Sequence, residues 1–186
     1  EFLETIRNLA HRLVDEIRSQ RELSQAERDE LEVSVRPVNI RTIVDDACES
    51  CAGHDMAEGR HLVRAAECDE VICETDPTLL RRVVANMVTN ALEASTEGDT
   101  VTVGCRREGD DAVCYVHNPG VMSDEVRRQV FQRSFTTKGA GRGLGTYSMK
   151  LLTEGYLCGH VWFTSREEEG TTFYCAVPAG NAGGMR

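Results

Sequence analysis

Segment 79–95 constrains the fold most, because it combines an apolar stripe of helical period with a pair of asparagines. Asn86 and Asn90 are spaced by four residues, so they share one flank of a helix. At about 100° per residue, the adjoining face collects a continuous set of apolar side chains: Leu80, Val84, Met87, Val88 and Ala91. We therefore expect a helix that is anchored by this stripe and carries two carboxamides along its border.

Two interpretations are open for these carboxamides. Amide oxygens at the edge of a core suit magnesium, which keeps several waters and shares phosphate oxygens with a nucleotide. A pair of asparagines can also simply solvate the flank of a helix, and the pair taken alone favours this second interpretation. A later segment of the chain favours the ligand interpretation.

That later segment is rich in glycine and precedes another helical pattern. Glycines alternate with other residues at positions 139, 141, 143 and 145, and the pattern at 146–152 follows. Such a segment can approach a phosphate closely and then present helix amides to it, with the charge of Lys138 beside it. It is neither a Walker loop nor a dinucleotide fingerprint, because no strand directly precedes it and no Gly-Lys-Ser/Thr ends it. A flexible hairpin is the alternative.

The order of the motifs is more specific than any one of them. The asparagine helix is followed by a strand that ends in a glycine turn at 116–121, by the run 131–138, by the glycine segment and by a Gly-Thr-x-Phe strand at 170–173. This ordered set resembles the ATP-binding catalytic domain of sensor histidine kinases, in the superfamily of gyrase, heat-shock chaperones and mismatch-repair proteins. The likeness covers residues 37–178.

The resemblance implies ATP and Mg²⁺ as cofactors and a role for each motif. Asn90 would bind the metal with Asn86 beside it, Lys138 and the glycines would wrap the phosphates, and Thr171 would border the adenine. Phe131 and Phe135 would flank a mobile lid at 135–145. Asn90 and Lys138 would be the catalytic residues. The implied cofactor contacts are Asn86, Asn90, Asn118, Gly120, Lys138, Gly141, Gly143, Leu144, Gly145, Thr146 and Thr171.

One position departs from the family pattern. The family's adenine turn normally opens with Asp, whose carboxylate accepts a hydrogen bond from the exocyclic amine of adenine. Here His117 or Asn118 falls at that place, depending on whether a one-residue gap is allowed, and Pro119 stands where a glycine is common. The side-chain oxygen of Asn can accept the same hydrogen bond, whereas a neutral His offers one ring nitrogen. We favour Asn118 as the acceptor, and His117 is then an ordinary strand-end residue.

The composition argues against several classes of function. The 186 residues carry a formal net charge of −10 and a pI near 5.0, which argues against nucleic acid as a partner. No apolar run reaches the length of a membrane span and no signal peptide is apparent, so we expect a cytoplasmic segment without membrane contact. The chain begins inside a helical pattern, so we expect a fragment whose sensor domain lies upstream.

The eight cysteines favour reduced thiols in a cytosol over a disulfide scaffold, because they are scattered through helical and strand patterns. Cys48 and Cys51 have a Cys-x-x-Cys spacing on a predicted helix. Neither a second pair nor another ligand set at zinc-finger spacing accompanies them, so we expect core or surface thiols rather than a metal or redox site.

Residues 1–36 are predicted to be part of a dimerisation element. Apolar residues at spacings of three and four predict an amphipathic helix to about residue 22, and Ser24 with Glu27 predicts a capping box, a break and a short helical piece to Leu31. Packing of the helix on its own domain is the alternative. The resemblance instead implies the second helix of a dimerisation hairpin, with the phosphoacceptor His before residue 1. The apolar seam comprises Phe2, Ile6, Leu9, Leu13 and Ile17.

His11 is the only histidine on this first helix. The acid that usually follows the family's phosphoacceptor is missing after it, so we expect a solvated helix residue. The fragment alone is then unable to phosphorylate itself.

The pattern of residues 37–178 predicts an α+β fold, a two-layer α/β sandwich of the Bergerat type. Asp76 and Pro77 open the asparagine helix as cap and first-turn proline. Alternating residues predict a largely antiparallel sheet, and residues 179–186 form a loose tail. The expected elements are a helix at 40–57 and strands at 60–65, 71–75, 100–105, 112–117, 159–166 and 170–178.

These features predict the ATP-binding domain of a two-component sensor histidine kinase. The implied partners are a second copy, joined through the N-terminal helix, and a response-regulator receiver domain. A degenerate nucleotide-binding or interaction module without kinase activity is one alternative, and an ATPase or serine kinase of the same superfamily is another. The intact Asn90, Lys138 and glycine segment argue against the first, and the hairpin-like helix argues against the second.

Overall fold

The computed structural model of the chain describes Ile6, Val14, Ile17 and residues 20–52, 59–133 and 144–180. Contacts divide the chain into two units, Glu1–Val33 and Ser34–Arg186. Within the described residues no helix is both long and apolar enough to cross a membrane. Phe2, Leu9, Leu13 and His11, to which we assigned roles on the first helix, lie outside these residues.

In the first unit, residues 20–27 are helical and the helix is closed by a left-handed residue. Asp29 has a φ of 56°. The N–H of Glu30 donates to the carbonyl of Gln25 at 2.9 Å, and the N–H of Asp29 donates to the carbonyl of Ala26 at 3.2 Å. This pattern is a Schellman C-terminus. The predicted break at Ser24 is therefore wrong: Ser24 lies inside the helix, and the turn at Asp29 ends it before Leu31.

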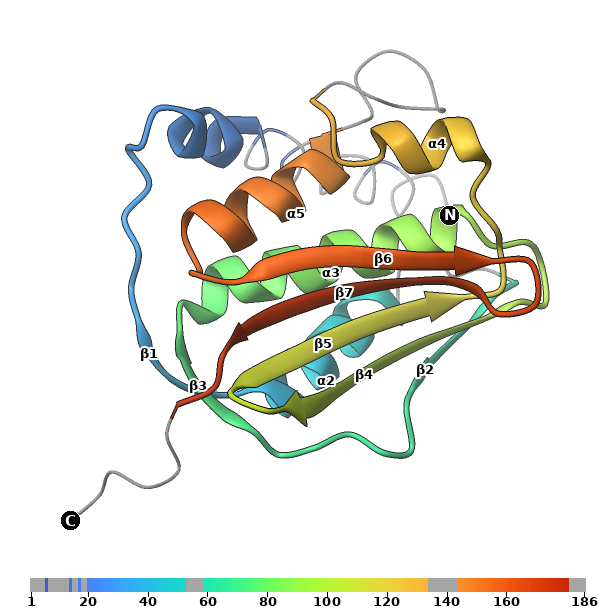
Figure 1. The fold of residues 1–186 in the computed structure, drawn as a ribbon, viewed down its shortest axis with the longest axis horizontal. Helices are drawn as coiled ribbons and strands as arrows, with labels where there is room; N and C mark the ends of the chain where they lie inside the picture. Colours follow the sequence, from blue (N-terminus) through green and yellow to red (C-terminus); the bar gives the residue numbers. More distant parts are fainter. Residues whose placement is uncertain are drawn as a thin grey trace. The chain divides into compact units, whose positions relative to one another are not determined.

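The second unit is built from a five-stranded sheet, a two-stranded sheet and helices. Figure 1 labels its elements, which in chain order are β1 (Arg36–Asn39), α2 (Ile40–Ala52), β2 (His61–Arg64), β3 (Ile72–Thr75), α3 (Pro77–Glu93), β4 (Thr100–Glu108), β5 (Asp111–Asn118), α4 (Asp124–Gln129), α5 (Leu144–Gly155), β6 (His160–Arg166) and β7 (Gly170–Pro178).

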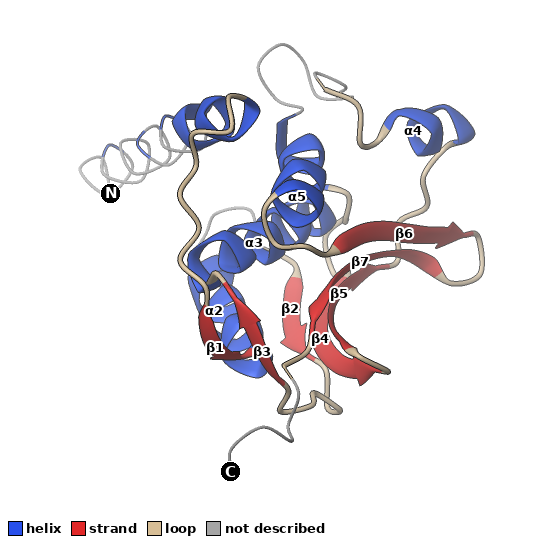
Figure 2. Cartoon of the chain, turned by 60° about the vertical axis from the view of Figure 1, so that its left-hand side comes forward, coloured by secondary structure: helices blue, strands red, loops and turns tan. Residues whose placement is uncertain are grey.

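The larger sheet has the strand order β2-β4-β5-β7-β6, and all its pairs are antiparallel except β2 with β4. β1 pairs with β3 in the smaller antiparallel sheet. Helices α2, α3 and α5 lie on one side of the larger sheet (Figure 2). The predicted two-layer α+β fold is confirmed. β1 was not predicted, because its four residues include Pro37 and carry too little alternation. The predicted helix at 40–57 is seen to Ala52, and residues 53–58 lie outside the described part.

Helix α3 forms the centre of the core. Every residue of its predicted stripe is buried, from Leu80 to Ala91. Its N-terminus follows the predicted capping chemistry, since Oδ1 of Asp76 accepts the N–H groups of Thr78 at 2.8 Å and Leu79 at 3.1 Å, and Pro77 fills the first turn. α3 packs against both α2 and α5. The flank that carries Asn86 and Asn90 is thereby held on a rigid element.

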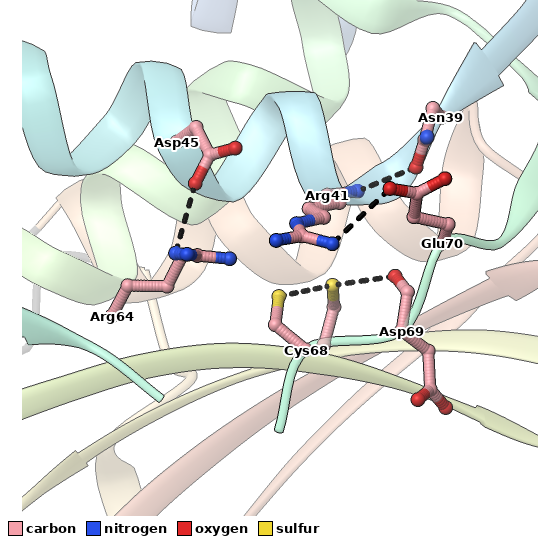
Figure 3. A network of polar contacts seen from close by, with 8 residues as sticks. Asn39, Arg41, Asp45, Arg64, Cys68, Asp69 and Glu70 are labelled. Carbon is pink, nitrogen blue, oxygen red and sulfur yellow. Dashed lines mark hydrogen bonds and ion pairs between the residues drawn. The ribbon is translucent and has the colours of Figure 1, made fainter. Parts of the chain in front are cut away.

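A polar network holds the segment between β2 and β3 against α2 and β4 (Figure 3). Arg41 pairs with Glu70 at 3.1 Å and Arg64 pairs with Asp45 at 3.2 Å. The sulfur of Cys68 lies 2.9 Å from the sulfur of Cys105, whose thiol also donates to the carbonyl of Asp69 at 3.4 Å. All eight cysteines are free.

Candidate functional site

The candidate site lies beside the C-terminal half of α3. Asn90 is half-buried, and its Nδ2 is buried without a hydrogen-bond partner in the part of the chain that the structure describes. A Cβ at Gly145 would lie 3.7 Å from this Nδ2 and 3.8 Å from Oδ1. The first turn of α5 therefore faces the Asn90 carboxamide. An unpartnered buried amide is unfavourable by about 1–3 kcal/mol, so this arrangement favours a ligand that supplies the missing acceptor.

The turn after β5 lies against the end of the same helix. Asn118, the last residue of β5, is only 2% exposed, and its Nδ2 also has no hydrogen-bond partner within the described residues. A Cβ at Gly120 would lie 2.8 Å from this Nδ2 and 2.9 Å from the carbonyl oxygen of Ala94, the C-cap of α3. Ala94 follows Asn90 by one helical turn, or about 6 Å along the axis. In Figure 1 the end of β5 and the C-terminal end of α3 lie on the same side.

The hydroxyl groups of Thr171 and Ser165 follow Asn118 on the next two strands of the sheet. Asn118 is opposite Thr171 on β7, which is opposite Ser165 on β6. The hydroxyl oxygens of Ser165 and Thr171 lie 2.8 Å apart, and that of Ser165 accepts the N–H of Met122 at 2.9 Å. Both residues are buried. Neighbouring strands thus hold the turn after β5 through side-chain and main-chain contacts.

His117 lies on the other face of the sheet, because successive residues of a strand point to opposite sides. Its Nδ1 lies 3.0 Å from the hydroxyl of Thr172. Along β5 the even-numbered residues from Ala112 to Asn118 are all buried, as expected for the face that the helices cover. Asn118 and not His117 therefore belongs to the side of the sheet that carries α3.

An aromatic cluster anchors the chain before the predicted lid. Phe131 contacts Phe163 and Phe173, with ring centroids 5.9 and 6.1 Å apart, and the ammonium of Lys150 lies 6.0 Å from the Phe131 ring. Phe163 and Phe173 belong to β6 and β7. The chain between α4 and α5 is thus attached to the sheet at its beginning.

The structure brings together part of the predicted site. Asn90 and Gly145 face each other, and Asn118, Gly120 and Thr171 meet at the end of β5. Leu144 and Thr146 also belong to the first turn of α5, and all three of its first residues are half-buried. Asn86 is half-buried one turn before Asn90. Lys138, Gly141, Gly143 and Phe135 lie outside the described residues.

Sequence reasoning missed Ser165 and the structural role of Gly170. Gly170 has a φ of 72°, and a Cβ there would lie 2.4 Å from the carbonyl oxygen of Asn118. The signal for Ser165 was the short turn between the last two strands, which pairs residue 165 with residue 171. Ser165 could be placed opposite Thr171 only once the exact register of β6 with β7 was known.

The residues present fit a nucleotide and its metal ion. No group of three or more His, Cys, Asp or Glu side chains in the described residues is arranged to hold a metal. The oxygen of Asn90 is a ligand of the kind that Mg²⁺ accepts, and its unpartnered Nδ2 can donate to a phosphate oxygen. The first turn of a helix such as α5 has N–H groups without intrahelical acceptors, which suit the same anion.

Comparison with known proteins decides the family. The family described as histidine kinase-, DNA gyrase B- and HSP90-like ATPase matches residues 75–181. The chain belongs to this family. Membership in a family of ATPases implies ATP as the nucleotide that the domain binds. The matched range contains Asn90, Asn118, Gly145 and Thr171.

Individual relatives include a sensor protein and a sensor-like histidine kinase. The sensor protein DegM of Bacillus sp. (strain B21-2) is 34% identical over 112 residues, which are 60% of this chain and 30% of that protein. The sensor-like histidine kinase SenX3 of Mycobacterium tuberculosis (strain H37Rv) is 30% identical in an alignment that covers 96% of this chain and 45% of that protein. The chain spans less than half the length of either relative.

A solved structure has the same fold. The catalytic domain of the histidine kinase ThkA superposes with a TM-score of 0.70 and 23% identity, over 78% of this chain and 95% of that one. Residues 34–180 thus have the fold of a histidine kinase catalytic domain.

Proposed function

We propose that this chain binds ATP with Mg²⁺ and, within a longer protein, directs the γ-phosphoryl group to a histidine that precedes residue 1. A response-regulator receiver domain would then accept the phosphoryl group. The observation that carries the proposal is the buried Nδ2 of Asn90, which has no hydrogen-bond partner among the described residues and faces Gly145 at the first turn of α5. The family match supports ATP binding, and similarity to the sensor-like histidine kinase SenX3 supports this function over other ATPase functions.

Each group at the site has a distinct task in this proposal. Oδ1 of Asn90 would hold the magnesium ion and Nδ2 would donate to a phosphate oxygen, with Asn86 beside them. The metal ion would neutralise charge on the phosphates, since phosphoryl transfer depends mainly on positioning and electrostatics. The N–H groups of Leu144, Gly145 and Thr146 would donate to phosphate oxygens. Lys138, Gly141 and Gly143, outside the described residues, would close over the phosphates.

Asn118 and Thr171 would hold the base at the other end of the site. Asn118 lies against the C-cap of α3, about one helical turn beyond Asn90, so the base and the phosphates occupy successive turns of one helix. Gly120 leaves room for the Asn118 amide. The N-terminal helix would join two copies, and a longer protein would supply the acceptor histidine.

The test is phosphorylation of the longer protein with γ-labelled ATP. We expect an acid-labile, alkali-stable label on a histidine upstream of residue 1, and its transfer to a receiver domain. Asn90→Ala should abolish labelling, whereas Thr89→Ala, on the side of α3 away from the buried stripe, should not. Nucleotide binding without any labelled histidine would contradict kinase activity and would indicate a binding module of the same fold.

A further inference from the structure

The buried amide nitrogen of Asn118, the residue proposed to face the base, is not held by a hydrogen bond within the described residues. Asn118 is 2% exposed and its Nδ2 has no hydrogen-bond partner among the described residues. Gly120 has no side chain, and even a Cβ there would come within 2.8 Å of this nitrogen. The amide is thus packed closely against Gly120, and no hydrogen bond from Nδ2 to the described residues opposes a 180° turn about the Cβ–Cγ bond. Such a turn exchanges an oxygen and an NH₂ group that are nearly alike in size.

We infer that Asn118 accepts either purine, so that the site takes both ATP and GTP. This inference rests on the proposed function, because it assigns the base to Asn118 and the phosphates to Asn90 and α5. A carboxamide carries one acceptor oxygen and one donor NH₂ group. Turning the amide exchanges the two positions, and the bound base selects the orientation.

The two purines present opposite hydrogen-bond patterns on the edge in question. At position 6 adenine offers the donor of its exocyclic amine, which matches Oδ1 of Asn118. Guanine offers the acceptor O6 at the same position, which matches Nδ2 after the turn. An ionised carboxylate only accepts, so it would pair with the amine of adenine and face O6 of guanine without any donor between them.

The neighbouring hydroxyl groups are compatible with either base. Thr171 and Ser165 lie 2.8 Å apart, and the Ser165 oxygen already accepts the N–H of Met122. A hydroxyl hydrogen rotates to suit its partner, so Thr171 can donate or accept toward the base. His117 does not contribute, because it lies on the other face of the sheet beside Thr172.

A pyrimidine offers similar polar groups but lacks the second ring. With its triphosphate held at Asn90 and the first turn of α5, a pyrimidine base would stop short of Asn118. We therefore expect discrimination by the size of the base, with little discrimination between the two purines.

The experiment is calorimetric titration of this chain with nonhydrolysable ATP and GTP analogues in the presence of magnesium. We expect the two dissociation constants to agree within tenfold. A CTP analogue should bind at least tenfold more weakly than either. Inosine triphosphate, which has O6 and N1–H but no 2-amino group, should bind like the GTP analogue, because only the edge that faces Asn118 matters.

Asn118→Asp is the discriminating variant, and His117→Ala is its matched control from the adjacent position. Asn118→Asp should tighten the ATP analogue about fivefold and weaken the GTP analogue and inosine triphosphate at least tenfold, because charged acceptors form stronger hydrogen bonds than neutral ones and two facing acceptors repel. His117→Ala should leave every ratio unchanged. Thermal melts verify that both variants are folded.

The outcomes separate this inference from the proposed function. If the unmodified chain prefers the ATP analogue by more than tenfold, or if Asn118→Asp folds but leaves the ATP to GTP ratio unchanged, purine acceptance by Asn118 is wrong while ATP binding stands. If the unmodified chain binds neither analogue, the proposed function fails and this inference fails with it.

Discussion

Gly170 approaches the main chain of Asn118 so closely that a Cβ at Gly170 would lie 2.4 Å from the Asn118 carbonyl oxygen. The first residue of β7 therefore supports the turn that carries the amide of Asn118. Glycine is also required by its φ of 72°, which side-chain-bearing residues rarely adopt. One residue thus links the conformation of a β-turn to the position of Asn118.

Gly170→Ala should lower both stability and nucleotide affinity, because the added methyl group must displace the turn. Gly109→Ala is the matched control: Gly109 has a similar φ of 61°, but a Cβ there meets nothing within 4 Å. We expect the control to lose about 1 kcal/mol from backbone strain alone and to keep its affinity. Chemical denaturation and calorimetry measure the two effects. Equal losses in both variants would show that the contact with Asn118 is unimportant.

The cysteines should differ widely in their rates of alkylation. Burial raises the pKa of the Cys73 thiol to about 11, and burial with the nearby Asp45 carboxylate raises the pKa of Cys48 to about 11. A raised pKa leaves less thiolate at pH 8, and the thiolate is the reactive form. Cys158 is exposed and should be labelled first.

The measurement is iodoacetamide labelling of the folded chain, followed by mass spectrometry of its peptides. Labelling of Cys48 should rise about tenfold for each pH unit between 8 and 10, because its thiolate fraction does so below the folded pKa. Cys73 should react only after denaturation. Labelling of Cys48 as fast as that of Cys158 at pH 8 would contradict its raised pKa.

Residues 135–145 are predicted to be a lid that is ordered by nucleotide, since alternating glycines constrain the backbone little. Its last two residues, 144 and 145, instead belong to the first turn of α5. Amide hydrogen exchange there should be fast in the free chain and slow with ATP and magnesium. The turn of the β4–β5 hairpin, around Gly109, serves as the internal control and should be unaffected. Equal protection of 135–145 in both states would reject the lid.

The helix of the first unit is predicted to join two copies of the longer protein. Leu9→Asp combined with Leu13→Asp should give a monomer in sedimentation experiments, because two charges would interrupt the apolar seam. Asn8→Asp combined with His11→Asp, which the sequence pattern places on the opposite side of the predicted helix, should leave a dimer. A dimer that survives the seam substitutions would rule out this helix as the dimer contact.

The helices and strands that have long periodic or alternating patterns of apolar residues could be predicted from the sequence. The stripe of α3, its Asp76 cap and the hairpins with alternating strands are all present, because each is specified by residues close together in the chain. Short or competing signals were less informative. Strand β1 contains a proline, and the capping-box spacing at Ser24 was overridden by a helix that ends instead at the left-handed Asp29.

The choice between His117 and Asn118 also depended on more than local sequence. Both residues can accept a hydrogen bond, and only the alternation of β5 against its packed helices assigns them to opposite faces. Ser165 could not be found without the register of β6 with β7. Gly145 and Asn90 lie near each other on two helices that are distant in sequence, so their proximity could not be predicted without the folded core.

The most direct test of the central claim is calorimetric titration of an ATP analogue into the unmodified chain and into Asn90→Ala, each with and without magnesium. If Asn90 holds the metal, magnesium should tighten binding to the unmodified chain at least tenfold and should have no effect on the variant. The melting temperature should change by only a few degrees, because a polar side chain at the edge of the stripe contributes little packing. Equal magnesium-dependent affinity in the two proteins would contradict the account.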